Sequence, residues 1–226
     1  MNVDNTLISN NDSANFAFSW KKYFSGIWQE LFLLMRYNLL FCLCCIPIIT
    51  IPASITAMHN VSVCIIRGDK PSLKKDAIPV FKREFGRSLL LGSIVLAIEA
   101  MTVTGFIFYI NLAKETTVFI LLAVTVGAIA LLVLLMSFYM FTMLALLDLS
   151  IKNVIKNAFL LTMLNFKYSI CAGVYVLILI AISVFLFPLT IPLTVTILLA
   201  LIFFTATYFS YYGINKFILS RKSFDE

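Results

Sequence analysis

Glu99 and His59 are the residues whose chemistry stands out in this sequence, because each lies inside a long apolar stretch. An ionisable side chain within a membrane-spanning segment is costly and is a candidate functional residue. His59 lies eight residues before Arg67, and Glu99 lies twelve residues after Arg87. As helix, these separations are about 12 Å and about 18 Å. If the two segments pack together, we expect a hydrogen bond between them, either in a solute path or as a protonated carboxyl that joins neighbouring helices.

The other residue types form no catalytic, metal-binding or cofactor-binding motif. The chain has one histidine, no glycine-rich phosphate loop and no HExxH sequence, so we expect neither enzymatic activity nor a cofactor. The run Cys-Leu-Cys-Cys has no paired histidine or second cysteine cluster, which argues against a metal site. We expect the cysteines to be small buried side chains, with palmitoylation left open. They are Cys42, Cys44, Cys45, Cys64 and Cys171.

Composition places these residues in a membrane protein. Of the 226 residues, 62% are hydrophobic and 12% are charged, whereas soluble domains average about 45–50% and about 25%. The net charge of +6 comes from short basic blocks between long apolar runs. That pattern fits membrane topology better than a nucleic-acid-binding face, so we expect no nucleic acid partner.

Six apolar stretches are candidate membrane-spanning helices, because about 20 residues of helix cross about 30 Å of hydrocarbon. They are 31–49, 51–66, 88–110, 118–147, 168–187 and 193–214. Seven of the 17 lysines and arginines lie between Arg67 and Arg87, whereas only Lys114 lies in a connection on the opposite side. The positive-inside rule then predicts an all-α, polytopic transmembrane helical bundle of about six spans in three hairpins, with both termini cytoplasmic. Anionic lipids of the inner leaflet should hold the basic loops.

The first hairpin is short for two crossings. Arg36 and Arg67 bracket 30 uncharged residues, which reach about 45 Å as helix, whereas two crossings need about 60 Å. Either Arg36 snorkels to the cytoplasmic face from within the membrane, or the hairpin is re-entrant. Pro47 and Pro52 would accommodate the turn in both cases, and we favour two tilted or thinned crossings.

We expect a single helical membrane domain over 16–219, a disordered N-terminal tail over 1–15 and a cytoplasmic C-terminal tail over 220–226. The polar start lacks the pattern of a cleavable signal peptide. Three cytoplasmic segments are amphipathic: 16–31, with both tryptophans, 73–85, which Pro79 bends or breaks, and 151–159, which Ser150 could cap. The apolar stripe of the third is a candidate partner-facing surface. It consists of Ile151, Val154, Ile155, Ala158 and Phe159.

An internal repeat links two of these segments. Shifting residues 75–96 by 81 positions aligns them with 156–177 without gaps. Seven positions are then identical, among them Ser88 with Ser169 and Gly92 with Gly173. Both copies read as an amphipathic helix followed by a span. Chance similarity between biased membrane compositions is the alternative explanation.

The stretch "RYNLLFCLCCIPIITIPASITAMHNVSVCIIRGD" resembles the YesL-like family of bacterial integral membrane proteins, a family of unknown function. The similar features are Asn38, Pro47 with Thr50, Thr56-Ala57 and Arg67-Gly68, followed by "PVFKREFGRSLLLG" before the next span. The resemblance implies a multi-pass protein of the bacterial plasma membrane. It also implies a role in sugar or glycan utilisation, because such proteins tend to be encoded beside carbohydrate ABC importers and glycoside hydrolases.

Two interpretations of function follow. The first is an accessory membrane component of a carbohydrate ABC importer, which would contact permease or ATPase subunits through its cytoplasmic amphipathic segments. The second is a self-contained transporter or channel for a small solute, with Glu99 and His59 in a polar path. A membrane scaffold or sensor is a third alternative.

Overall fold

The computed structural model describes residues 18–114 and 116–219, which form helices joined by short turns, with no strand among them. This confirms the all-α class. The predicted tails at 1–15 and 220–226 lie outside the described residues. The elements are α1 (Trp20–Gln29), α2 (Leu31–Cys44), η2 (Ile48–Thr50), α3 (Ile51–Arg67), η3 (Leu73–Ala77), α4 (Ile78–Arg83), α5 (Phe85–Leu112), α6 (Val118–Leu146), α7 (Ile151–Leu164), α8 (Phe166–Phe185), α9 (Ile191–Leu193), η4 (Thr194–Leu198), α10 (Leu199–Ile214) and η5 (Asn215–Leu219).

The long helices pair as three hairpins: α2 with α3, α5 with α6, and α8 with α10. Within residues 18–114 and 116–219, five helical segments are long and apolar enough to cross a membrane, and the α1–α2 pair, bent by 71°, is a sixth candidate. The chain is therefore a multi-pass membrane protein. α2 alone has 14 residues, which is about 21 Å of helix against a hydrocarbon core of about 30 Å. The first hairpin thus contains a helix too short to cross an undeformed bilayer unaided.

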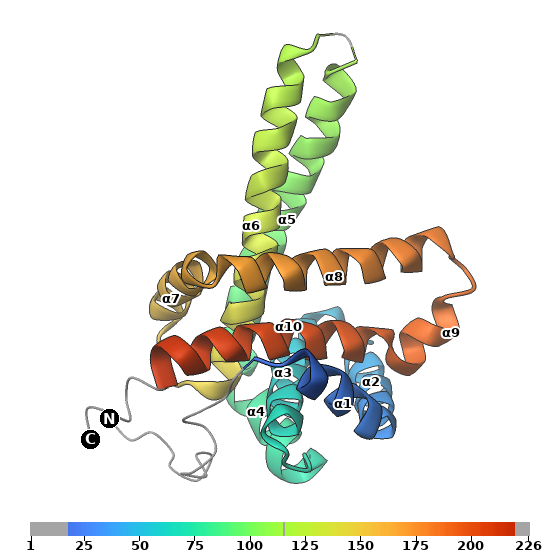
Figure 1. Ribbon diagram of the computed structural model, residues 1–226, viewed down its shortest axis with the longest axis vertical. Helices are drawn as coiled ribbons and strands as arrows, with labels where there is room; N and C mark the ends of the chain where they lie inside the picture. Colours follow the sequence, from blue (N-terminus) through green and yellow to red (C-terminus); the bar gives the residue numbers. More distant parts are fainter. Residues whose placement is uncertain (1–17, 115, 220–226) are drawn as a thin grey trace.

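The returning helices of the three hairpins, α3, α6 and α10, pack against one another. Figure 1 shows the α5–α6 hairpin projecting away from the other helices, while α8 and α10 run side by side across its base. The hairpins therefore point in different directions from the region where α3, α6 and α10 pack together. α5 has 28 residues and α6 has 29, which makes each about 42 Å long. Their outer halves leave most of their large apolar side chains exposed.

A one-residue elbow precedes the outgoing helix of each hairpin. Glu30 separates α1 from α2, Glu84 separates α4 from α5, and Asn165 separates α7 from α8. Their φ/ψ angles are −107°/20°, −94°/5° and −110°/28°, all near the bridge region. Each elbow N–H donates to the carbonyl four residues earlier, and each elbow carbonyl accepts from the N–H four residues later. The chain bends without losing these backbone hydrogen bonds, as a lipid environment requires.

The elbows also share a burial pattern, which extends the predicted repeat from two copies to three. The side chains seven residues before, four residues after and seven residues after each elbow are all buried. The three copies share the positions that are buried, but they do not share the residue types at those positions. Sequence identity therefore does not reveal the first copy. The buried residues are Tyr23, Leu34 and Tyr37 in that copy, Ala77, Ser88 and Leu91 in the second, and Ala158, Ser169 and Ala172 in the third.

Two equivalent glycines of the repeat allow close contacts between helices. A Cβ atom on Gly92 would lie 2.6 Å from Pro52 Cβ, and one on Gly173 would lie 2.5 Å from Leu135 Cδ2. Small residues let helix backbones approach in membranes, where packing replaces hydrophobic transfer as the force between helices. Gly92 thus lets α5 pack closely against α3, and Gly173 lets α8 pack closely against α6.

The amphipathic segments form helices as predicted, with differences at their ends. α1 buries Tyr23 and leaves both tryptophans exposed. The second segment is divided next to Pro79 into the π-helical turn η3 and the short helix α4. The third extends as far as Leu164, and Ser150 occupies its N-cap position without a side-chain hydrogen bond. The helix therefore begins where predicted but lacks the predicted cap.

Candidate functional site

A buried polar cluster joins the three returning helices. His59 Nδ1 on α3 lies 2.9 Å from the Thr142 hydroxyl on α6 and 2.8 Å from the Thr207 hydroxyl on α10. The Thr142 hydroxyl also lies 2.8 Å from the Ser210 hydroxyl on α10. All four side chains are at most 2% exposed. We call His59, Thr142, Thr207 and Ser210 the polar core.

The threonine hydroxyls of the polar core also bond to backbone carbonyls. The Thr142 hydroxyl donates to the Phe138 carbonyl at 2.8 Å, and the Thr207 hydroxyl donates to the Phe203 carbonyl at 2.7 Å. A hydroxyl has one proton, so both threonine oxygens face His59 as acceptors. In this arrangement the Nδ1–H of His59 is assigned as the donor to both threonine oxygens.

The polar core joins helices α3, α6 and α10 through side-chain hydrogen bonds. Hydrogen bonds between membrane helices are worth about 0.6–2 kcal/mol each. The His59 ring also packs against Phe141 and Phe203, with centroid distances of 6.1 Å and 5.8 Å. Because the side chains are buried and the threonine hydroxyls donate to backbone carbonyls, the polar core is not placed to bind a solute.

His59 and Glu99 do not form the predicted hydrogen bond. Thr56 on α3 lies 2.7 Å from Ser88 on α5, and a second contact one turn further on shows that the helices run antiparallel. His59 lies three residues beyond Thr56 on α3, and Glu99 lies eleven residues beyond Ser88 on α5. Because the two helices run in opposite directions, these separations add up to about 21 Å along the helices. The prediction was wrong because it measured both depths from flanking arginines. Arg87 lies level with the middle of α3, not with its end.

Glu99 lies instead near the midpoint of α5, on the projecting hairpin. Its side chain is half-buried, and its Oε1 atom is buried without a hydrogen-bond partner among the described residues. Thr102, one turn away, donates its hydroxyl to the carbonyls of Ile98 and Glu99 at 2.9 and 3.1 Å. The structure therefore does not give Glu99 the neighbour that the sequence predicted, and its role as a functional residue stays a prediction.

The predicted partner-facing stripe on α7 belongs largely to the protein's own core. Val154 and Ala158 are fully buried in a cluster with residues of α6 and α10. Ile151 and Ile155 are half-buried against the same cluster, and only Phe159 is exposed. Val154 and Ala158 are thus unavailable to a partner subunit. Amphipathic periodicity identifies an apolar face, but it does not say which surface covers that face.

An ion-pair network at the second elbow was missed by the sequence analysis. The Glu84 side chain is 1% exposed, and its carboxylate lies 2.8 Å from Arg83 Nε and 2.9 Å from Arg87 Nη1. Arg87 Nη1 lies 3.0 Å from Asp148 Oδ1, and Arg87 Nη2 donates to the Leu149 carbonyl. The network ties the elbow to the connection between α6 and α7. The available signal was an acid flanked by two arginines beside an expected helix break.

Asn38, to which the sequence analysis assigned no role, is a buried link between the first and third hairpins. Its side-chain N–H₂ donates to the carbonyls of Thr194 and Val195 at 2.9 and 2.6 Å. Its side-chain oxygen accepts a hydrogen bond of 2.7 Å from the Ala200 N–H. These backbone groups belong to η4 and the start of α10, where a π-helical turn displaces the regular hydrogen bonds. Asn38 therefore satisfies polar groups that lipid could not.

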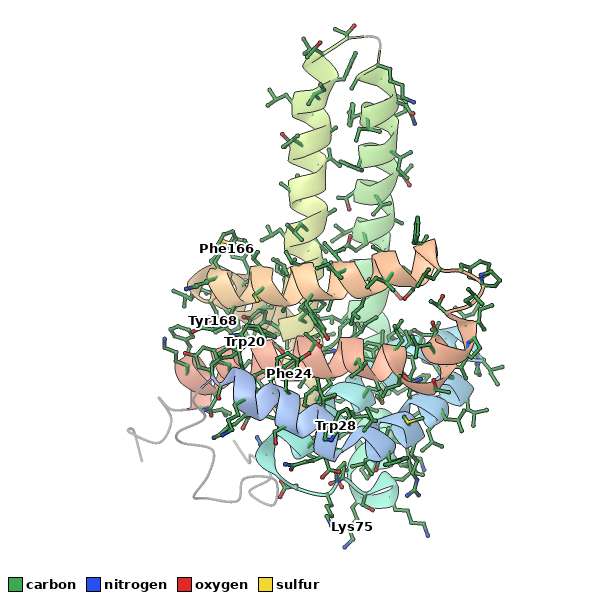
Figure 2. All side chains as sticks on the ribbon, turned by 45° about the vertical axis from the view of Figure 1, so that its right-hand side comes forward. Trp20, Phe24, Trp28, Lys75, Phe166 and Tyr168 are labelled. Atoms are coloured by element: carbon green, nitrogen blue, oxygen red, sulfur yellow. The ribbon has the colours of Figure 1, made fainter. Side chains whose placement is uncertain are left out.

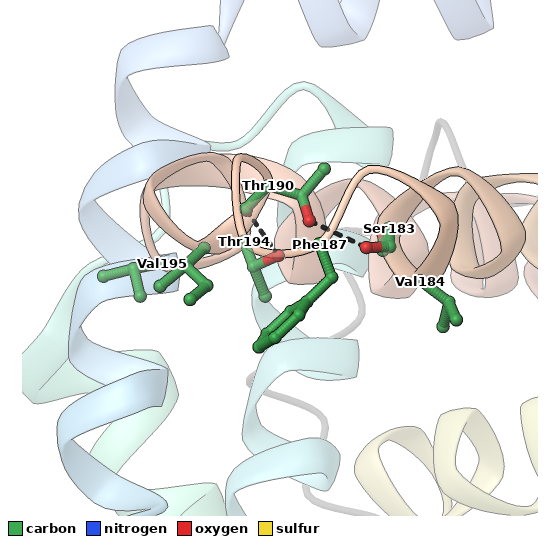
Figure 3. Close-up of a pocket in the computed structure, with 7 residues that line it drawn as sticks. Ser183, Val184, Phe187, Thr190, Thr194 and Val195 are labelled. Carbon is green, nitrogen blue, oxygen red and sulfur yellow. Dashed lines mark hydrogen bonds between the residues drawn. The ribbon is translucent and has the colours of Figure 1, made fainter.

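A groove of about 480 Å³ lies at the tip of the third hairpin, between α8 and η4 (Figure 3). The Thr190 hydroxyl donates to the Ser183 carbonyl at 2.7 Å, and the Thr194 hydroxyl donates to the Thr190 carbonyl at 2.9 Å. The hydroxyl protons are thus used internally, and the surface that remains suits an apolar chain better than a sugar. The lining residues are Ser183, Val184, Phe187, Thr190, Ile191, Thr194 and Val195.

Residues 34–112 match the family described as "Protein of unknown function, DUF624". YesL-like proteins carry this domain, so the match confirms the resemblance at the level of that domain. No curated protein matches the chain, and no solved structure matches it.

Proposed function

Because residues 34–112 carry a DUF624 domain of the kind found in YesL-like proteins, we propose that the protein is an accessory membrane component of a carbohydrate ABC importer. In this proposal it has no catalytic step and no transport path of its own. It associates with permease or ATPase subunits, which supply both. The resemblance supports the link to sugar utilisation, and the geometry favours an accessory role over transport.

The closed polar core is the observation that carries the proposal. A path for a hydrophilic solute needs polar groups that the solute can reach, whereas His59 and its partners are buried and hydrogen-bonded to one another. The competing interpretation, a self-contained transporter, would place His59 and Glu99 in one path. They are about 21 Å apart along their helices. The polar groups of the membrane segments therefore fit the joining of helices better than conduction.

The orientation in this proposal places the basic segments η3–α4 and α7 in the cytoplasm of a bacterium, at the plasma membrane. Lys74, Lys75 and Lys82 are exposed on η3–α4, whereas the Asp76 carboxylate turns back and accepts a hydrogen bond of 2.6 Å from the Ser72 N–H. The exposed cations suit anionic lipids of the inner leaflet. Figure 2 shows Lys75 pointing away from the fold.

The aromatic side chains of α1 mark the level of the membrane interface in this proposal. Trp20, Phe24 and Trp28 are 49%, 59% and 81% exposed, and Figure 2 shows them along one side of α1. Tryptophan and other aromatic rings concentrate at the headgroup level of membranes. α1 would then lie in the inner interface, while the elbow at Glu30 directs α2 toward the hydrocarbon.

Reconstitution and copurification test the proposal together. We expect the full-length protein alone in liposomes to give no uptake of labelled mono- and oligosaccharides above empty liposomes. We expect an affinity-tagged copy, purified in mild detergent from a bacterium that expresses it with an adjacent importer, to bring down the permease or ATPase subunits. Saturable uptake by the protein alone would favour the transporter instead. Absence of importer subunits from the purified material would remove the accessory role.

A further inference from the structure

An aromatic cluster joins three parts of the chain that lie far apart in the sequence. The Phe18 ring, just before α1, lies 4.7 Å from the Tyr168 ring at the start of α8 and 5.7 Å from the Tyr212 ring near the end of α10, as centroid distances. Tyr168 and Tyr212 are 5.0 Å apart, and Trp20 is 5.3 Å from Phe18. Figure 2 shows Trp20 and Tyr168 close together. We call these four residues the aromatic cluster.

Lysines border the aromatic cluster on each of its three elements. The Lys216 ammonium on η5 lies 5.9 Å from the centroid of the Tyr212 ring and 5.3 Å from that of Phe217. Cation–π contacts of this length hold an ammonium group beside aromatic rings. Lys167 and Lys21 are chain neighbours of cluster residues, and both are exposed. The cluster thus carries cations at its edge.

These lysines have no acidic partner in the part of the chain that the structure describes. The ion pairs of residues 18–114 and 116–219 join Glu84 and Asp148 to arginines of the second elbow. From Leu149 to Leu219 the sequence contains no aspartate and no glutamate, so α8, α10 and η5 bring cations without acids. A group of uncompensated cations attracts an anion.

An apolar stripe on α8 begins next to Lys167. Phe166, Val174 and Ile178 are 51%, 49% and 51% exposed, and Ile170 between them is half-buried. Residues four apart share one face of a helix, and these four cover about 18 Å of it. The stripe therefore extends from the lysines into the hydrocarbon, as an acyl chain below an anionic headgroup would.

We infer that the aromatic cluster and its lysines bind the phosphodiester headgroup of an anionic phospholipid, and that one acyl chain lies along the stripe on α8. Basic pockets between membrane helices on the cytoplasmic side bind such headgroups, and half-exposed aromatic rings belong at headgroup level. Inorganic phosphate would leave the stripe unused. The site is separate from the exposed lysines of η3–α4, and it does not depend on the proposed association with an importer.

Trp20 provides the probe, because Trp28→Phe leaves it as the one tryptophan of the chain. The full-length variant in mild detergent is mixed with phosphatidylglycerol or phosphatidylcholine that carries bromine atoms, which quench tryptophan fluorescence on contact, near the headgroup end of one acyl chain. We expect phosphatidylglycerol to reach half-maximal quenching at a lower mole fraction. The expected difference is about fivefold for each lysine that contacts the headgroup.

Two double variants locate the site. Lys167→Gln with Lys216→Gln should remove most of the preference for phosphatidylglycerol. Lys74→Gln with Lys75→Gln is the matched control, since it removes the same charge from exposed lysines of η3 and leaves the aromatic cluster and its lysines unchanged. The control should keep the preference. All four lysines are exposed, so both variants should stay folded, as thermal melts in detergent will verify.

Equal quenching by the two lipids would overturn the inference. An equal loss of preference in the two double variants would also overturn it, because the lysines would then act only through the total charge of the protein. Relief of quenching by inorganic phosphate, beyond that by chloride at the same ionic strength, would identify a free anion as the ligand instead. The measurement requires no importer subunit, so its result and the result of copurification are independent.

Discussion

Thr56 on α3 and Ser88 on α5 share a hydrogen bond of 2.7 Å that couples the first hairpin to the second. The third copy of the repeat has a counterpart, in which Ser169 on α8 lies 2.8 Å from the Tyr139 hydroxyl on α6. Each serine lies four residues after an elbow. The same position of the repeat thus sets the register between an outgoing helix and a neighbouring returning helix.

The Thr56–Ser88 contact should be measurable as a coupling energy. We expect Ser88→Ala and Thr56→Val each to lower the free energy of unfolding by about 1 kcal/mol, because a buried partner loses its hydrogen bond. In the double variant, we expect a coupling of about 0.6 kcal/mol. Unfolding in detergent micelles by a denaturant titration would measure it. Strict additivity would show that the two hydroxyls do not interact.

The close helix contacts predict a graded effect of alanine at three glycines. Gly92→Ala should destabilise the protein by about 1–3 kcal/mol, the cost of overpacking, because the Pro52 ring cannot yield. Gly173→Ala should cost less, since the new Cβ meets the end of the flexible Leu135 side chain. Gly86→Ala is the matched control.

Nothing lies within 4 Å of a Cβ on Gly86. We therefore expect Gly86→Ala to raise stability by up to about 1 kcal/mol through helix propensity. Melting temperatures of the three variants in one detergent would show whether the loss of stability follows the closeness of the helix contact. An equal loss for Gly86→Ala and Gly92→Ala would mean that glycine acts through backbone flexibility rather than through close contact.

Asn38 should be among the most sensitive positions of the membrane domain. Asn38→Leu leaves two carbonyls and one N–H of η4 and α10 without partners, each worth about 1–3 kcal/mol when buried. We expect a large loss of folded protein. Asn111→Leu is the control, since Asn111 is exposed near the hairpin tip and its side chain bonds to Ile107 and Lys114. Size-exclusion profiles of the two variants should differ, and similar profiles would argue against the link.

The two arginines that flank Glu84 should contribute unequally. Arg87 is 27% exposed and pairs with both Glu84 and Asp148, whereas Arg83 is 48% exposed. Removing one partner of a buried pair costs about 3–5 kcal/mol, and an exposed pair is worth about 0–1 kcal/mol. We expect Arg87→Ala to destabilise the protein more than Arg83→Ala. Adding Glu84→Gln to each variant should reduce the difference in stability between Arg87→Ala and Arg83→Ala. If the difference remains without the Glu84 charge, it arises from side-chain packing.

The hairpins and the positions of the amphipathic segments follow from the sequence because apolar length and helical period are local properties. The repeat between the second and third elbows was visible for the same reason. The first copy was not, because it shares with the others only the side of the helix that is buried. Tyr23 and Ala158 occupy the same position of the repeat without any chemical likeness.

The contacts between helices could not be predicted in this way. The expected pairing of His59 with Glu99 assumed that basic residues mark one common level, whereas the Thr56–Ser88 contact shows α5 displaced along α3. The role of Asn38 depends on the π-helical turn η4, and no pattern in the sequence predicts that turn. For α7, the sequence pattern identified an apolar face, but α6 packs against it. Placement of helices relative to one another decided each of these cases.

The most direct test of the account is the side of the membrane on which the exposed lysines lie. In a variant whose five cysteines are replaced by alanine, Lys75→Cys and Lys114→Cys report on η3 and on the tip of the α5–α6 hairpin. A membrane-impermeant maleimide should label Lys114→Cys in intact cells and Lys75→Cys only after permeabilisation. Labelling of Lys75→Cys in intact cells, or of both cysteines from the same side, would contradict the membrane arrangement on which the proposed function depends.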